Sequence, residues 1–144
     1  MTDISVVSTA FQVENRNWYL GTADEPGFTK SVNLDVSGFT AATHYPNGFL
    51  KSGIVLGMIT ATGKYVPYVD AAVDGSGVAA CILFSSVKVP DLADLTHDVN
   101  GAGLCAFAAV SLAKLLLVVA NAATGGGFID ANGQTDLRNI YFAA

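Results

Sequence analysis

Charge is scarce in this chain. Asp, Glu, Lys and Arg make up 13% of its 144 residues, against a usual share of about 25%. Hydrophobic residues account for 51%, so the chain is unlike disordered sequences, which combine low hydrophobicity with high charge. The length fits one domain. So few charges leave apolar surface that lipid, a second copy of the chain or another protein must cover.

Clustered positive charge is absent as well. The chain has 7 Lys and Arg against 12 Asp and Glu, a net charge of −5. The cations stand singly in the sequence, at Arg16, Lys30, Lys51, Lys64, Lys88, Lys114 and Arg138. Proteins that bind nucleic acid neutralise phosphates with clustered Lys and Arg. The sequence therefore predicts no nucleic-acid partner.

Cysteine is rare too, with only Cys81 and Cys105, both in apolar runs. Two cysteines do not make the disulfide framework of a small secreted domain, and an unpaired cysteine behaves as a small hydrophobic residue. We therefore expect two buried free thiols. The first residues lack the basic start and apolar stretch of a signal peptide, which predicts synthesis in a reducing cytoplasm.

No arrangement of residues predicts catalysis. The stretch from Gly57 to Lys64 resembles a phosphate-binding loop only superficially, because five residues separate its glycines and Tyr65 replaces the required Ser or Thr. A hairpin turn explains it better. His44 and His97 share no metal-ligand spacing with either cysteine, which favours loop histidines. We expect no enzyme activity, no catalytic residue, no metal site and no cofactor.

Short β-strands are the main structural signal. Val32, Leu34 and Val36 alternate with polar residues, which is typical of a half-buried strand. Further β-rich runs lie at 53–60, 64–68, 78–89 and 136–142. The turn at 61–63 predicts a hairpin, and Pro67 indicates a strand end or a sheet edge. Strands at this spacing predict a mainly β fold with little helix, a small single-domain barrel or sandwich.

The segment 99–129 allows three interpretations. It carries a single charge, Lys114, and its middle, 104–123, is almost wholly apolar and nearly long enough to span a bilayer. It could form a membrane helix, a buried helix that ends at the glycines 125–127, or buried strands. Lys114 opposes the membrane helix by about 2.5–3.5 kcal/mol. Helix propensity favours the buried helix, because Ala, Leu and Lys dominate.

One stretch carries a family resemblance. Residues 49–68, FLKSGIVLGMITATGKYVPY, resemble a segment of bacteriophage head decoration proteins, the lambda protein D-like capsid cement proteins, in the form carried by phages of actinobacteria. The upstream run VNLDVSGF at 32–39 is similar too, as are the loop with Asp74 and Gly75 and the run VAACILF at 78–84. The likeness extends from about residue 18 to the end of the chain, and it is specific over 44–84.

The resemblance implies a structural virion protein on the outer surface of the capsid. Such a protein is made in the host cytoplasm, binds the major capsid protein after the shell expands, commonly forms a homo-trimer, and resists the pressure of packaged DNA. It has no nucleic-acid or membrane partner and no catalytic residues. The resemblance also implies a strand at 103–116, against helix propensity. The alternative is a small membrane-associated protein anchored through 104–123.

The resemblance further suggests an N-terminal arm that becomes ordered on the shell. Residues 1–17 hold isolated hydrophobic residues without a period that would bury them, so we expect an extended arm here and a β-rich domain at 18–144. Its anchors on the capsid would be Phe11, Val13 and Arg16, and the backbone would add a strand to an exposed edge. Alternatively, 2–17 is the first strand of the domain.

Overall fold

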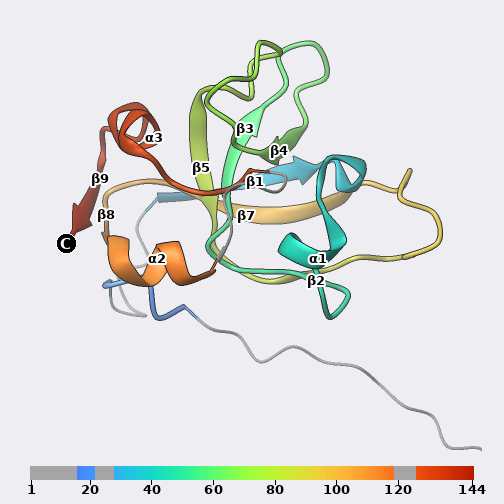
Figure 1. Ribbon diagram of the computed structural model, residues 1–144, viewed down its shortest axis with the longest axis horizontal. Helices are drawn as coiled ribbons and strands as arrows, with labels where there is room; N and C mark the ends of the chain where they lie inside the picture. Colours follow the sequence, from blue (N-terminus) through green and yellow to red (C-terminus); the bar gives the residue numbers. More distant parts are fainter. Residues whose placement is uncertain (1–15, 22–27, 119–125) are drawn as a thin grey trace, which may run out of the picture.

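Five strands close into a small barrel in the computed structural model, which describes residues 16–21, 28–118 and 126–144 (Figure 1). In their order around the barrel they are β1 (Phe28–Leu34), β4 (Tyr65–Pro67), β3 (Val55–Met58), β5 (Ala79–Leu83) and β7 (Val99–Ala106). The prediction of a mainly β fold with little helix is therefore confirmed. Four strands form two smaller sheets: β2 (Phe49–Leu50) pairs with β6 (Val87–Lys88), and β8 (Ala108–Ser111) pairs with β9 (Ile140–Ala143).

The helices of the described residues are all short. They are the 3-10 turn η1 (Val36–Gly38) and the helices α1 (Ala41–His44), α2 (Leu112–Val118) and α3 (Ala131–Asp136). In Figure 1, α2, α3, β8 and β9 gather on one side of the barrel, and α1 with β2 lies on another.

Alternation along β1 is confirmed by burial. Val32 and Leu34 are buried, and the residues between and before them are exposed. Val36 is buried too, but it belongs to η1 and not to the strand, because Asp35 ends the extended chain. The Asp35 carboxylate accepts a hydrogen bond from Ser37 N at 3.2 Å and so caps the turn.

The predicted hairpin forms between β3 and β4. Leu56 pairs with Pro67 and Met58 with Tyr65, so β4 ends at the proline as expected. Gly63 turns the chain at a φ of +71°, a conformation that favours glycine. Gly57 serves a different purpose, because a Cβ there would collide with the backbone of Ser76.

Two hydrophobic clusters pack on opposite faces of β5. One contains Leu34, Leu56 and Leu83 with other barrel residues, and it continues to Tyr45 and Leu50 around α1. The second joins residues of β3, β5 and β7 to the C-terminal elements; its members include Trp18, Val55, Ile82, Leu104, Val110, Leu115 and Ile140. The C-terminal elements therefore cover an apolar outer face of the barrel that would otherwise meet water.

The ambiguous segment begins as two strands and continues as a short helix. Residues 99–106 form β7 and 108–111 form β8, which confirms the strand implied by the resemblance as far as residue 111. The helix favoured by propensity is wrong up to that point and occurs only in α2. The reason is pairing, since β7 is held between β1 and β5 on both edges, and such contacts override intrinsic propensity. The residues of 104–123 thus do not form one continuous helix, and residues 119–123 lie outside the described part.

A membrane-crossing helix was the third interpretation of that segment. Within residues 16–21, 28–118 and 126–144, no helix has both the length and the apolar character needed to cross a bilayer.

The C-terminal strand is shorter than predicted. Residue 136 ends α3, and β9 begins only at Ile140. The prediction failed because Asp130 starts a helix: its carboxylate accepts a hydrogen bond from Gly133 N at 2.7 Å. Such a cap satisfies a backbone N–H that has no partner within the helix.

Candidate functional site

Of the three predicted arm anchors, the structure describes Arg16. Phe11 and Val13 lie outside the described residues. The Arg16 side chain is exposed, and its guanidinium carbon lies 4.6 Å from the centre of the Phe84 ring. A cation over an aromatic face at this distance is attracted by about 0.5–1 kcal/mol at an exposed site. Arg16 thus contacts the residue that follows β5.

Trp18 fixes the segment 16–21 to the domain. Its ring is fully buried, and its indole Nε1–H donates a hydrogen bond to Ser52 Oγ at 3.0 Å. The Ser52 hydroxyl in turn donates to the backbone oxygen of Phe84 at 3.1 Å. Sequence reasoning missed this link because 34 residues separate Trp18 from Ser52; the only hint was that Trp18 is the single tryptophan of the chain.

Three aromatic rings meet at this point. Trp18, Tyr19 and Phe84 pack edge to face, with ring centres 5.9 Å apart for Trp18 and Tyr19, 6.4 Å for Trp18 and Phe84, and 5.3 Å for Tyr19 and Phe84. Such pairs contribute about 0.5–1.5 kcal/mol each beyond their buried area. The segment is therefore held by side chains as well as by its backbone.

The backbone of this segment runs along β8. Tyr19 forms an antiparallel bridge with Val110, Leu20 N donates to Ala109 O at 3.0 Å, and Ser111 N donates to Trp18 O at 2.7 Å. The other edge of β8 pairs in parallel with β9, for example Ala109 with Tyr141. Chain preceding β1 and chain at the C-terminus therefore meet on the two edges of one strand.

Three exposed aromatic residues surround the turn between β7 and β8; we call Phe28, Phe107 and Tyr141 the aromatic corner. Phe28 pairs with Ala106, Phe107 N donates to Asn139 O, and Tyr141 pairs with Ala109. Their side chains are 53%, 78% and 70% exposed. Phe107 also has a φ of +57°, an uncommon conformation for a residue with a side chain. Strained residues often lie at functional sites, so Phe107 is a candidate contact residue.

Other exposed apolar residues lie on β3 and in the loop between β4 and β5. They are Met58 at the end of β3 and Val69, Val73 and Val78 in the loop. Val73 is fully exposed. These residues are aliphatic and stand on a loop, so they are a suitable comparison for the aromatic corner.

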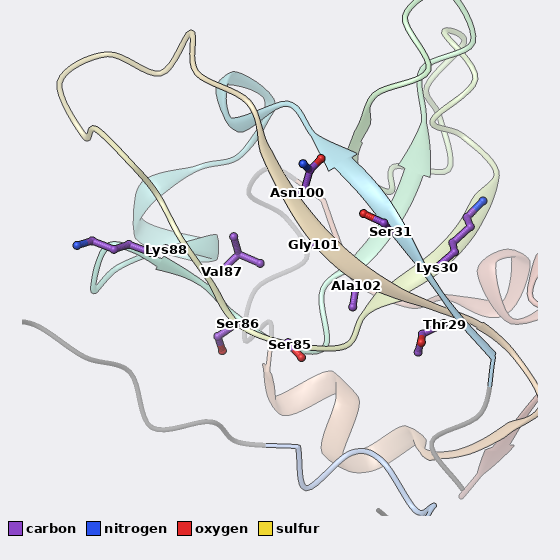
Figure 2. A pocket seen from close by; sticks show the side chains of 10 residues that line it. All are labelled: Thr29, Lys30, Ser31, Ser85, Ser86, Val87, Lys88, Asn100, Gly101 and Ala102. Atoms are coloured by element: carbon purple, nitrogen blue, oxygen red, sulfur yellow. The ribbon is translucent and has the colours of Figure 1, made fainter.

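A surface hollow of about 600 Å³ lies beside β1, β6 and β7 (Figure 2). Hydroxyl and amide groups line it, from Ser31, Ser85, Ser86 and Asn100 among others. Figure 2 shows the side chains of Lys30 and Lys88 extending away from it. The hollow can donate and accept hydrogen bonds, but it brings together no pair of groups suited to acid–base or nucleophilic chemistry.

The titratable residues have structural surroundings. His44 is buried at the end of α1, not in a loop as predicted: its Nδ1 accepts from Thr40 N at 2.8 Å and its Nε2–H donates to Gly126 O at 2.8 Å. Burial lowers the pKa of His44. His97 is exposed and lies 3.4 Å from the Asp94 carboxylate. In the described ranges, no three His, Cys, Asp or Glu side chains are grouped to hold a metal ion.

Comparison with known families agrees with this picture. The family of bacteriophage lambda head decoration protein D matches residues 29–112, which is more than half of the chain. The match runs from the second residue of β1 to the first residue of α2 and thus covers the barrel except Phe28. No curated protein sequence matches the chain.

The closed barrel and the family match define a small β-barrel structural protein of the phage head. The chain belongs to the bacteriophage lambda head decoration protein D family. The resemblance seen in the sequence is therefore confirmed. Membership also implies a location in the virion capsid, and the family's structural role fits the prediction of a non-enzyme.

Proposed function

We propose that this protein binds the outer surface of the expanded capsid as a homo-trimer and stabilises it against the pressure of packaged DNA. The observation that carries the proposal is the family match over nearly the whole barrel. The low share of charge, 13%, supports it, because a subunit with little charge suits burial against twin subunits and a shell. The partner would be the major capsid protein, with no nucleic acid and no membrane.

We further propose that residues 1–17 act as the docking arm and that Phe11, Val13 and Arg16 anchor it. The support is the position of Trp18, which is locked into the domain directly after this stretch. Because Trp18 is buried and hydrogen-bonded at the end of the arm, an arm bound to the shell would be firmly connected to the barrel. The domain would then start at residue 18 and contain the rest of the chain.

The aromatic corner is the surface we expect to face the shell. It surrounds the start of β8, the strand along which Tyr19 and Leu20 run. The segment 16–21 and the aromatic corner therefore lie on neighbouring parts of the molecule. Exposed aromatic side chains are also common anchors of protein interfaces, since they bury a large area at a small entropic cost.

Sedimentation with shells tests the proposal. We expect the purified protein to pellet with expanded, empty shells of the same phage and to remain in the supernatant with unexpanded ones.

Deletion of residues 2–14 should leave a folded oligomer that binds shells weakly. An unfolded deletion product would favour the interpretation of 2–17 as a domain strand, and unchanged binding would refute the anchoring role.

A matched pair of substitutions tests the binding surface. Phe107→Ser should reduce shell binding at least tenfold, and Val73→Ser, at a fully exposed site on the β4–β5 loop, should leave it unchanged. The reverse order would place the contact on the loop.

Analytical ultracentrifugation checks the trimer, and a stable monomer at micromolar concentration would contradict it. Flotation with lipid vesicles tests the membrane alternative, for which we expect no binding.

A further inference from the structure

The two cysteines lie on neighbouring strands, opposite one another. In the antiparallel pair of β5 and β7, Ile82 pairs with Leu104 and Leu83 with Gly103. One step further along this ladder, Cys81 on β5 comes opposite Cys105 on β7. Both thiols are free in this structure, as the sequence predicted; Cys81 is buried, but Cys105 is only half-buried.

Both sulfur atoms contact the same residue, Gly103. A Cβ at Gly103 would lie 2.8 Å from Cys81 Sγ, and Cys105 Sγ donates to Gly103 O at 3.3 Å. The two side chains thus lie on the same face of the sheet. A larger residue than glycine at position 103 would push the Cys81 sulfur away.

The type of pairing suits a covalent link. The hydrogen bond from Phe84 N to Ala102 O identifies residues 84 and 102 as a hydrogen-bonded pair. The same alternation, carried one residue past the last pair of the ladder, Ile82 with Leu104, gives 81 and 105 the register of a non-hydrogen-bonded pair, although the bulge of β7 against β1 falls at Cys105. In such pairs the Cα atoms are about 4.5 Å apart. A disulfide spans Cα separations of about 4.4–6.8 Å. A cross-strand pair in this register is thus within the range that a disulfide spans.

The surroundings give the two thiols different roles. Cys105 is the bulged residue of β7, since Phe28 pairs with Ala106 and Thr29 with Leu104. Its pKa is lowered to about 7, because the Cys81 thiol hydrogen-bonds to its sulfur and the positive charge of Lys30 is near. The pKa of Cys81 is raised by that hydrogen bond and by burial. Cys105 is thus the more acidic thiol of the pair, and Cys81 lies beside it.

We propose that Cys81 and Cys105 form a thiol pair that closes to an intramolecular disulfide, with Cys105 as the thiol that reacts first with small disulfides. The Cys105 thiolate attacks a low-molecular-weight disulfide, forms a mixed disulfide and releases one thiolate. The Cys81 thiol loses its proton to solvent, attacks the Cys105 sulfur and expels the second thiolate. Two protein thiols are oxidised, one small disulfide is reduced to two thiols, and β5 becomes tied to β7.

The change of surroundings between synthesis and the released virion gives such a thiol pair a use. The family belongs to the virion, which leaves the reducing cytoplasm, where disulfides are rare, for surroundings in which they persist. A link between residues 81 and 105 restricts the unfolded chain and so stabilises the folded barrel. The protein would therefore be assembled with free thiols and stiffened afterwards.

Oxidation of the purified full-length protein tests this inference without any shell, so its failure is distinct from failure of the proposed function. The reduced protein is incubated with oxidised glutathione at pH 8, then alkylated and weighed by mass spectrometry. We expect loss of the mass of two hydrogens, protection of both cysteines from alkylation, and a Tm raised by about 5–10 °C that dithiothreitol reverses.

Single variants separate the two roles. Cys81→Ala should accumulate a stable glutathione adduct on Cys105, and Cys105→Ala should accumulate neither adduct nor disulfide. Two wild-type results would overturn the proposal: both thiols still open to alkylation at equilibrium with the oxidant, or an adduct on Cys105 that never resolves. Because the wild-type mass needs no variant, the test stands even where a variant fails to fold.

Discussion

Replacing Ser52 with alanine removes one hydroxyl that bonds to a buried indole and to a backbone oxygen. Ser52 Oγ accepts from the indole of Trp18 and donates to the Phe84 backbone oxygen. Trp18 is fully buried and Ser52 is 3% exposed, so water cannot easily replace the lost group. Among the described residues, no buried side-chain nitrogen or oxygen lacks a partner; Ser52→Ala would create the first such atom, Trp18 Nε1.

The expected cost follows from that orphaned donor. A buried polar group left without a partner costs about 1–3 kcal/mol. The free energy of unfolding should fall by this amount, and Tm by about 3–9 °C. Trp18→Phe removes the donor itself, so Ser52→Ala added to Trp18→Phe should cost about 1 kcal/mol less than Ser52→Ala alone.

Urea denaturation measures these values by circular dichroism for all variants. Because Trp18 is the only tryptophan, its fluorescence also reports on the segment 16–21 in Ser52→Ala. Emission that shifts to the red before the barrel unfolds would show local release of the segment. A Ser52→Ala variant within 0.5 kcal/mol of the wild type, or strictly additive effects in the double variant, would refute the reasoning.

Three further predictions concern the barrel and its turns. Burial lowers the pKa of His44 below its usual value of about 6.5, so the unfolded chain takes up the proton first as the pH falls. The free energy of unfolding should therefore be highest above about pH 6.5 and decrease below it. In urea titrations at several pH values, His44→Gln should lose this dependence. Gly57→Ala should lower Tm in a thermal scan, because its Cβ meets the Ser76 backbone, whereas Gly63→Asn, at a position with open space, should have a small effect. Phe107→Asn should raise the free energy of unfolding by up to about 1 kcal/mol, because asparagine tolerates a positive φ better; an unchanged or lower value would show that the ring of Phe107 contributes to the fold.

Local patterns predicted the parts of the fold that depend on neighbouring residues. Val32 and Leu34 alternate with polar residues because β1 has one exposed face, and Gly63 marks a turn that its φ requires. The strands at 104–111 were not predictable from propensity, because pairing with β1, β5 and β9 decides their conformation. The link of Trp18 to Ser52 was equally hidden, since nothing in either local sequence indicates the other.

The way the barrel closes has a consequence for how the chain folds. The longest ladder joins β1 to β7, and Phe28 pairs with Ala106, 78 residues later in the chain. Contacts between such distant residues carry a large loop-closure entropy and slow folding to milliseconds or seconds. On the ribosome, β1 must wait for β7 with an unpaired edge exposed. Nascent chains are therefore most vulnerable to aggregation between the synthesis of β1 and that of β7. Faster translation up to β7 should increase the yield of folded protein more than a stronger β3–β4 hairpin would.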